Sequence, residues 1–182
     1  MAPPIAPVYP PLVIRVPDPA LVLLVGPSGA GKTTFARRLF RPTEILSSDA
    51  FRAWVTDDEA DQNVSPEAFT LLHRLARLRL RHRRTVVVDA TNTTTMARRP
   101  LLAWARRVGV PTAAFVFRYP LGVHVELDRR RRRRRVGREV IARQLGQLNR
   151  SWSALFAEGH AVLVLLPDPA AAAAVALERV RR

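Results

Sequence analysis

The chain of 182 residues is long enough for one ordinary domain, which would bury about two thirds of its unfolded surface. It contains no cysteine, which excludes a disulfide framework and a thiolate zinc site and favours an intracellular setting. The formal net charge is +15, which favours an acidic partner such as nucleic acid. Lys32 is the only lysine among the 30 lysines and arginines, and a GC-rich coding bias would produce the same skew, so charge alone leaves the partner open.

The sequence carries no signal for a membrane. Residues 21–25 form an apolar stretch that is far too short to span a bilayer, and the amino terminus lacks the basic region and apolar run of a signal peptide. We therefore expect a soluble, cytoplasmic protein.

From residue 20 onward, short β-branched runs alternate with longer amphipathic segments, a pattern that predicts βα units and a parallel sheet. The expected fold class is α/β, with one domain over residues 20–182 and a five-stranded, mostly parallel sheet flanked by helices. Residues 1–19 contain seven of the fifteen prolines and are expected to form an extended lead-in, with an edge strand at 12–16. The strands are expected at 21–25, 44–47, 85–88, 113–117 and 161–166. Helices are expected at 33–40, from 65 to about 80, up to 108 and, because the end of the chain is rich in alanine, at 169–182.

The first βα connection reads Gly-Pro-Ser-Gly-Ala-Gly-Lys-Thr, which matches the phosphate-binding loop in its proper strand-to-helix context. Glycines let the backbone N–H groups approach a phosphate chain at a helix amino terminus. Lys32 should contact the β- and γ-phosphates, and the Thr33 hydroxyl should bind the Mg²⁺ that bridges them. The loop therefore predicts a P-loop NTPase fold that binds ATP with Mg²⁺. Nucleotide binding is assigned to Gly26, Pro27, Ser28, Gly29, Ala30, Gly31, Lys32, Thr33 and Thr34.

The second predicted strand ends in Ser-Ser-Asp-Ala-Phe-Arg, which places Asp49 at the edge of the sheet where ligands bind. A carboxylate there can accept a proton from an attacking hydroxyl, so Asp49 is the candidate general base. Arg52 follows one helical turn later and can hold an anionic group of the acceptor. The alternative is that Asp49 only caps the next helix and that Arg52 is a solvated side chain.

The third predicted strand ends in Asp89, the usual position of a second metal-orienting carboxylate in P-loop enzymes. Two roles are open for this residue: it could orient Mg²⁺ through a water, or it could pair with Arg52 and fix that arginine for the acceptor. Asn92 follows in a loop rich in threonine and is assigned, with Asp89, to the acceptor side. The alternative is a loop that only caps the next helix.

Three further stretches make the sequence resemble the kinase module of the polynucleotide kinase family, which includes bacterial RNA-repair and phage end-healing kinases. They are Ser-Ser-Asp-x-x-Arg at 47–52, Asp-Ala-Thr-Asn-Thr-Thr at 89–94 followed by Arg-Arg-Pro-Leu-Leu at 98–102, and Val-Gly-x-x-Val-Ile-x-Arg-Gln at 136–144. The resemblance covers about residues 20–166. It implies a general base at Asp49, an acceptor-phosphate contact at Arg52 and support of Arg52 by Asp89.

The resemblance also implies an arginine lid over the phosphates at about residues 121–150, where the chain has seven consecutive arginines at 129–135. Most charge runs are solvated faces, but phosphoryl transfer needs cations beside the transferring group. The family usually shows spaced arginines with an asparagine among them, and the asparagine is absent here. Counting back from Val136 selects Arg132 and Arg134 as the catalytic lid arginines.

Together these features predict an ATP-dependent kinase that phosphorylates the 5′-hydroxyl of RNA or DNA, with catalytic roles for Lys32, Asp49, Arg132 and Arg134. One alternative is a kinase for a small molecule such as a nucleoside or an antibiotic, and another is a nucleic-acid-binding ATPase. No segment resembles a phosphatase or ligase, so repair partners would be separate proteins, and assembly into a homo-oligomer is left open.

Overall fold

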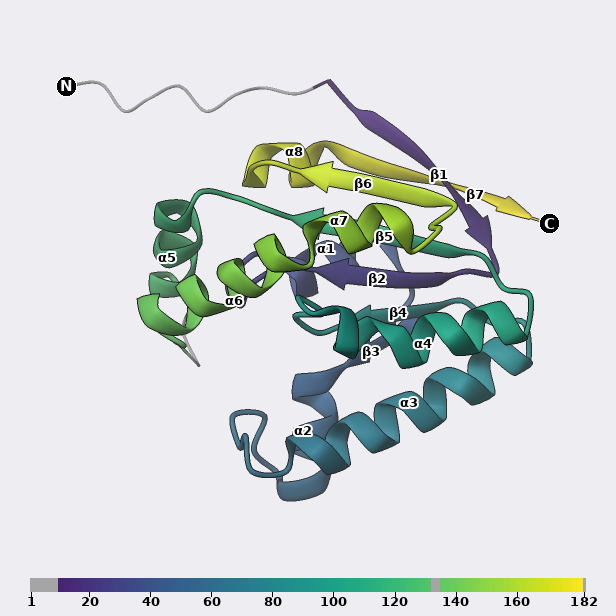
Figure 1. Cartoon of the computed structure of the whole chain (residues 1–182), viewed down its shortest axis with the longest axis horizontal. Helices are drawn as coiled ribbons and strands as arrows, with labels where there is room; N and C mark the ends of the chain where they lie inside the picture. Colours follow the sequence, from purple (N-terminus) through teal and green to yellow (C-terminus); the bar gives the residue numbers. More distant parts are fainter. Residues whose placement is uncertain (1–9, 132–134, 182) are drawn as a thin grey trace.

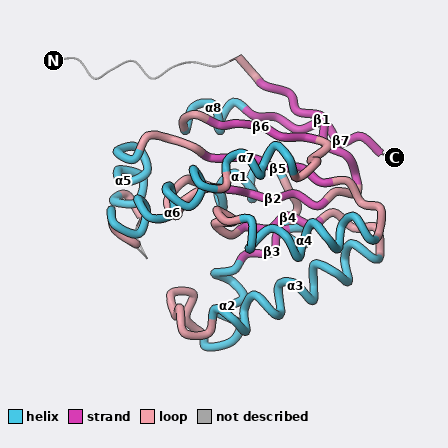
Figure 2. The backbone as a smooth tube through the Cα atoms, viewed as in Figure 1, coloured by secondary structure: helices cyan, strands magenta, loops and turns pink. Residues whose placement is uncertain are grey.

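The computed structural model describes residues 10–131 and 135–181, which form a central sheet with helices on both faces (Figures 1 and 2). The main sheet has five parallel strands in the order β3-β4-β2-β5-β6, as the alternating pattern predicts. Its strands are β2 (Leu21–Val25), β3 (Ile45–Ser47), β4 (Val86–Asp89), β5 (Thr112–Phe117) and β6 (Val162–Leu166). The three central strands are buried throughout, which explains why each reads as a nearly continuous apolar run.

Helices follow the strands in the manner of a doubly wound fold. They are α1 (Lys32–Leu39), α2 (Ser48–Thr56), α3 (Ser65–Arg81), α4 (Thr95–Arg107), α5 (Leu121–Arg129), α6 (Arg138–Arg150), α7 (Trp152–Ala157) and α8 (Pro169–Ala174), with a 3₁₀ turn at Pro42–Glu44. Within the described ranges, none of these helices is both long and apolar enough to cross a membrane.

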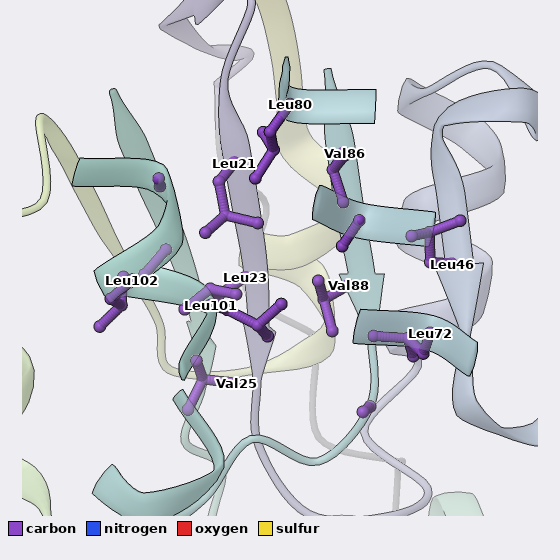
Figure 3. Packing of buried hydrophobic residues seen from close by; sticks show 14 of the residues in the cluster. Leu21, Leu23, Val25, Leu46, Leu72, Leu80, Val86, Val88, Leu101 and Leu102 are labelled. Carbon is purple, nitrogen blue, oxygen red and sulfur yellow. The ribbon is translucent and has the colours of Figure 1, made fainter. Parts of the chain in front are cut away.

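Two apolar clusters hold the layers together, one on each face of the sheet. On one face the odd-numbered residues of β2 pack against α3 and α4, with Leu72, Leu80 and Leu101 among the contacts (Figure 3). On the other face the alternate residues Val22 and Leu24 pack with α1 and α8. Because successive strand residues point to opposite faces, β2 contributes to both clusters and is the most enclosed strand.

The carboxyl-terminal segment differs from the expected closing helix. Only Pro169–Ala174 is helical, and the chain then forms β7 (Val175–Arg181), which pairs in parallel with β1 (Leu12–Asp18) in a second, two-stranded sheet. The edge strand expected at 12–16 is therefore present, but its partner is the end of the chain. After Ala174 the segment Val-Ala-Leu-Glu-Arg-Val-Arg is only partly buried and is tied to β1 along its whole length, so tertiary pairing overrides the helical preference of the alanines before it.

Candidate active site

The phosphate-binding loop connects β2 to α1 at the carboxyl ends of the parallel strands, which the arrowheads of β2 and β6 mark in Figure 1. Its first residue, Gly26, donates its backbone N–H to the Thr91 carbonyl at 2.9 Å. A Cβ at Gly26 would lie 2.7 Å from the Phe117 carbonyl oxygen, so only glycine fits between the loop and β5. The loop is thus held on both sides by the strands that flank β2.

Lys32 is buried, and its Nζ donates to the carbonyl oxygens of Gly26 and Pro27 at 2.9 and 2.7 Å. Burial lowers the pKa of the ammonium to about 8, although the nearby carboxylates of Asp89 and Asp49 act in the opposite direction. The side chain is therefore an enclosed cation that can exchange two backbone partners for phosphate oxygens.

Thr33 and Asp89 meet across the pocket, where the Thr33 hydroxyl donates to Asp89 Oδ2 at 2.7 Å. Burial raises the pKa of the Asp89 carboxyl, and Lys32 and the Thr33 hydroxyl offset part of that effect. A hydroxyl beside a carboxylate is an all-oxygen donor set of the kind Mg²⁺ prefers, and these two residues therefore fit the ion expected from the sequence. Of the two roles considered for Asp89, the contacts match the one beside the metal position, because its hydrogen bond goes to Thr33.

Asp49 and Arg52 lie one turn apart at the start of α2 and form an ion pair. The Arg52 side chain is only 5% exposed, and its Nε also donates to the Glu59 carbonyl at 2.9 Å. The Asp49 side chain is 41% exposed and faces the pocket. Arg52 thus holds the carboxylate from behind and leaves one side of it open to a ligand.

The loop, the strand ends and Asp49 line one pocket of about 270 Å³. Its wall contains seven of the nine residues assigned to nucleotide binding, so the donor side and the candidate base share a single cavity. These seven are Ser28, Gly29, Ala30, Gly31, Lys32, Thr33 and Thr34. Leu127 and Arg131 close the pocket from α5 and the residues after it.

Two helices in the expected lid region contact the phosphate-binding loop directly. A Cβ at Gly29 would lie 3.2 Å from the Asp128 Cβ, which shows how closely α5 packs on the loop. The buried Asp128 carboxylate accepts hydrogen bonds from the N–H groups of Val136 and Gly137 and so joins the two ends of the arginine-rich segment. From α6, Gln144 Oε1 accepts the Ser28 N–H at 2.7 Å.

The lid arginines chosen from the sequence, Arg132 and Arg134, lie outside the described residues. Arg131 is described, lines the pocket and lowers the pKa of Lys32 through its charge. Neither Arg131 nor Gln144 was singled out from the sequence, because a run of identical arginines has no register and a helical glutamine gives no signal of its own. The Arg-Gln pair at 143–144 within the family-like stretch was the only available hint for Gln144.

Asn92 lies buried beneath the site, and its assignment to the acceptor side stays a prediction. It is 2% exposed, and its Nδ2 donates to the carbonyl oxygens of Leu24 and Val88. Its backbone φ is +48°, a conformation that asparagine tolerates better than most residues. The amide therefore fixes the loop after β4 and has no exposed donor for an acceptor.

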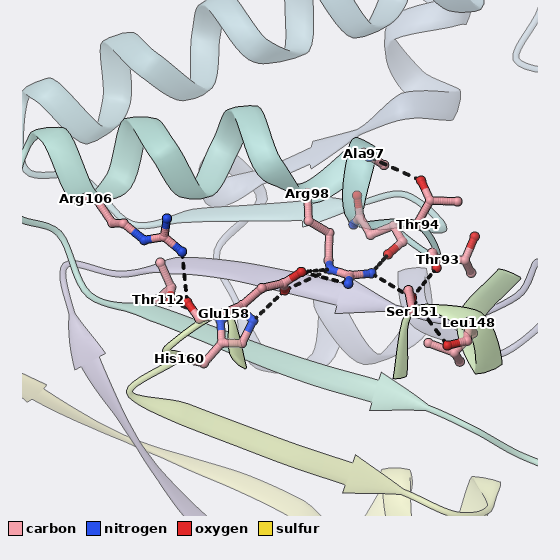
Figure 4. A network of polar contacts seen from close by, with 11 residues as sticks. Thr93, Thr94, Ala97, Arg98, Arg106, Thr112, Leu148, Ser151, Glu158 and His160 are labelled. Atoms are coloured by element: carbon pink, nitrogen blue, oxygen red, sulfur yellow. Dashed lines mark hydrogen bonds and ion pairs between the residues drawn. The ribbon is translucent and has the colours of Figure 1, made fainter. Parts of the chain in front are cut away.

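A buried network supports the same loop from the other side (Figure 4). The fully buried Arg98 pairs with Glu158 and donates to the Asn92 carbonyl at 2.8 Å, while Ser151 Oγ donates to the Thr93 carbonyl at 2.7 Å. These contacts join α4 and the α6–α7 junction to the loop after β4. The part of the pocket wall that carries Asp89 is therefore supported by the ion pair of Arg98 and Glu158, which lies outside the pocket.

A phosphate-binding loop after the central strand of a parallel sheet, with a hydroxyl, two carboxylates and a buried lysine in one pocket, defines a P-loop phosphotransferase that binds a nucleotide. The family model described as "AAA domain" matches residues 21–180, so the chain belongs to that family. No curated protein matches the sequence.

Several solved structures share the fold. One is a chain of the "Pnkp1/Rnl/Hen1 RNA repair complex", with a TM-score of 0.65, 22% identity and coverage of 75% of this chain and 46% of that chain. The "putative kinase" of Chloroflexus aurantiacus j-10-fl has a TM-score of 0.55, 18% identity and coverage of 82% and 85%. The Deinococcus radiodurans tunicamycin resistance protein has a TM-score of 0.51, 18% identity and coverage of 72% and 80%. This chain thus spans less than half of the first of these proteins.

Proposed function

We propose that the protein transfers the γ-phosphoryl group of ATP to the 5′-hydroxyl end of a polynucleotide. The observation that carries the proposal is that Asp49, a partly exposed carboxylate, shares one pocket with Lys32 and Thr33 of the phosphate-binding loop. A carboxylate that can act as general base for an alcohol therefore lies beside the residues assigned to the donor phosphates, which supports transfer to a hydroxyl over hydrolysis alone.

Asp49 accepts the proton of the attacking hydroxyl, and Arg52 holds the carboxylate in place through their ion pair. Because the Arg52 guanidinium is buried and already bonded to Asp49 and to the Glu59 carbonyl, its main task in this proposal is to position the base. The contact of Arg52 with an acceptor phosphate, expected from the family resemblance, stays a prediction.

Lys32 leaves the carbonyl oxygens of Gly26 and Pro27 and binds the β- and γ-phosphates, whose charge grows on the oxygens during transfer. Thr33 and Asp89 are the residues that would hold Mg²⁺, and the ion would supply further positive charge to the same phosphates. Arg131 adds a cation at the mouth of the pocket. The Gln144 carboxamide oxygen, which accepts the Ser28 N–H, yields that donor to a phosphate oxygen.

A polynucleotide acceptor is supported by the order of family-like motifs, by the net charge of +15 and by the shared fold with a chain of an RNA repair complex. That phosphatase and ligase activities would come from separate proteins stays a prediction from the sequence. The competing acceptor is a small molecule, and the shared fold with a tunicamycin resistance protein is the observation that favours it.

The test is a transfer assay with γ-labelled ATP in which 5′-hydroxyl oligonucleotides, nucleoside 3′-monophosphates and plain nucleosides are compared side by side. We expect label on the oligonucleotide, and a rate of labelling lower by about 10²- to 10⁴-fold when Asp49 is replaced by asparagine. Label on a plain nucleoside with none on the oligonucleotide would replace the proposal with the small-molecule kinase. ATP hydrolysis with no labelled acceptor would replace it with an ATPase.

A further inference from the structure

A second cavity, of about 480 Å³, opens beside the phosphate pocket at the β3 edge of the main sheet. The two cavities share three residues, Thr33, Ser47 and Asp89, so a molecule that enters the second one reaches the residues that would hold Mg²⁺ in the first. Its volume lies within the range of small-ligand sites. We call this cavity the α1–α2 groove; the rest of its lining is Arg37, Pro42, Ile45, Ala50, Phe51 and Trp54.

The α1–α2 groove is apolar and aromatic where the phosphate pocket is polar. Trp54 is 70% exposed, an unusual position for the largest apolar side chain. The buried Phe51 contacts it edge to face with ring centroids 4.8 Å apart, and this contact leaves most of the indole surface open. An exposed indole at the rim of a groove is a platform for a flat ring.

The two faces of α2 separate the chemistry of the base from this platform. Asp49 lines the phosphate pocket, and Arg52, one turn later, is paired with it. Ala50 and Trp54 also lie one turn apart, and they line the groove. A ligand whose hydroxyl reaches Asp49 can therefore extend along α2 onto Trp54.

Arg37 is the part of the groove that can bind a phosphate. It is exposed and is the one basic residue among the described residues of the lining, and its charge opposes the rise in the pKa of Asp89, the carboxylate of the same lining. A free nucleobase would use the apolar wall alone, whereas a nucleotide within a strand presents a ring for Trp54 and an anion for Arg37.

We propose that the α1–α2 groove binds the first nucleobase at the 5′-hydroxyl end of a single-stranded polynucleotide, stacked on Trp54, with Arg37 beside the following phosphate. This inference rests on the proposed function and names the part of the acceptor that the groove recognises. A base inside a duplex is stacked on its neighbours and cannot reach Trp54, so a single-stranded end is the preferred acceptor.

The test compares the full-length parent with Trp54→Ala and Trp54→Phe. Stacking of one base on an aromatic ring corresponds to about 5- to 150-fold in affinity. We expect Trp54→Ala to raise KM for a single-stranded 5′-hydroxyl oligonucleotide by about that factor, with KM for ATP unchanged and kcat nearly so, and Trp54→Phe to recover most of the loss. Phe156→Ala, which removes an exposed aromatic ring from α7, is the matched control and should behave as the parent.

Binding without turnover separates this inference from the proposed function. Single-stranded oligonucleotide should quench the tryptophan fluorescence of the parent, and the quench should disappear in Trp54→Phe, which keeps Trp104 and Trp152. If the parent labels the oligonucleotide but Trp54→Ala has an unchanged KM, the groove proposal is overturned while the kinase stands. If the parent labels nothing, the fluorescence quench still tests the groove: a quench that depends on Trp54 supports it, and the absence of one overturns it. A nucleoside or blunt duplex that binds as tightly as the single strand also overturns it.

Discussion

At the scale of single residues, the buried charge of Lys32 is the feature with the clearest energetic consequence. Its folded-state pKa is about 8 against 10.5 for the ordinary lysine, so between those values the unfolded chain binds more protons than the folded one. Stability therefore rises with pH across that window, and below pH 8 the full cost of burying the ammonium is present.

Replacing Lys32 by methionine should remove this cost while it abolishes phosphoryl transfer. We expect the nucleotide-free variant to be more stable than the parent by about 1 to 3 kcal/mol at pH 7, because the desolvation of the cation outweighs its two carbonyl contacts. The advantage should shrink between pH 8 and 10.5. Urea unfolding of both proteins across this range measures the effect, and a parent that is the more stable protein at pH 7 would contradict it.

A second prediction concerns Asp49 and Arg52, which contact each other but should affect catalysis by different routes. Asp49→Asn keeps the shape and removes the proton acceptor, so kcat should fall about 10²- to 10⁴-fold at every acceptor concentration. Arg52→Ala frees the carboxylate to move, and kcat should fall for acceptors with and without a 3′-phosphate alike. Steady-state kinetics with a nucleoside 3′-monophosphate and a plain nucleoside provide the comparison.

The outcome for Arg52 also tests the acceptor clamp implied by the family resemblance. If Arg52→Ala raised KM only for the acceptor that carries a 3′-phosphate, the arginine would bind that phosphate and positioning of the base would be secondary.

Sequence reasoning reached Asp49 and Asp89 because the carboxyl ends of parallel strands converge on one edge of the sheet, so a polar residue after an apolar run is placed by topology alone. The rule does not extend to Asn92, which lies three residues after Asp89 and donates its amide to backbone carbonyls beneath the loop. Nothing in a sequence distinguishes an amide that faces a ligand from one that anchors a turn.

At the scale of elements, the contact between α5 and the phosphate-binding loop is the main support of the pocket from the lid side. Gly29 and Gly31 provide a matched pair for testing it, because their φ values are +79° and +81° but their surroundings differ. A Cβ at Gly29 meets Asp128 and the His124 carbonyl, whereas a Cβ at Gly31 meets nothing within 4 Å.

Alanine is strained to a similar degree at two positions with nearly the same positive φ, so the difference in stability between the two variants reports the packing of α5 against the loop. We expect Gly29→Ala to be less stable than Gly31→Ala by about 1 to 3 kcal/mol in urea unfolding, the usual cost of overpacking. Equal stabilities would mean that α5 yields without cost and is not a fixed wall of the site.

The elements that sequence reasoning placed correctly have a strong local pattern, such as the continuous apolar run of β2 and the helical spacing of apolar residues in α3. The closing helix was mispredicted because alanine favours helix locally, whereas residues 175–181 find a strand partner 163 positions earlier, as in the pair Leu12 and Val175. The arginine-rich segment is a run of identical residues without a period. Only the family resemblance placed its ends, and the sequence does not show which of its arginines face the phosphates.

At the scale of the whole molecule, β1 and β7 bring the two ends of the described chain together, and one ion pair joins this small sheet to the main one. The guanidinium of Arg179 on β7 binds both carboxylate oxygens of Glu44 at 2.6 Å, just before β3. Although burial raises the pKa of the Glu44 carboxyl, the Arg179 bonds and charge more than offset it and hold that pKa below its ordinary value.

Arg179→Ala should therefore destabilise the protein by about 1.5 to 3 kcal/mol, because it leaves a carboxylate that is 7% exposed without its bidentate partner. A control lies on the same sheet: the pair of Arg15 and Glu178 is 70% and 52% exposed, so Arg15→Ala should cost less than about 1 kcal/mol.

The stabilising effect of the Glu44–Arg179 pair should also depend on pH. A folded-state pKa below the unfolded value gives stability that is present above the ordinary pKa of 4.5 and lost as pH falls through the folded-state pKa. The difference between the parent and Arg179→Ala, measured by urea unfolding, should thus be constant near neutral pH and shrink below about pH 4. A difference that stayed the same in acid, or one no larger than that of Arg15→Ala, would show that the small sheet is attached to the main one by its apolar contacts and not by this ion pair.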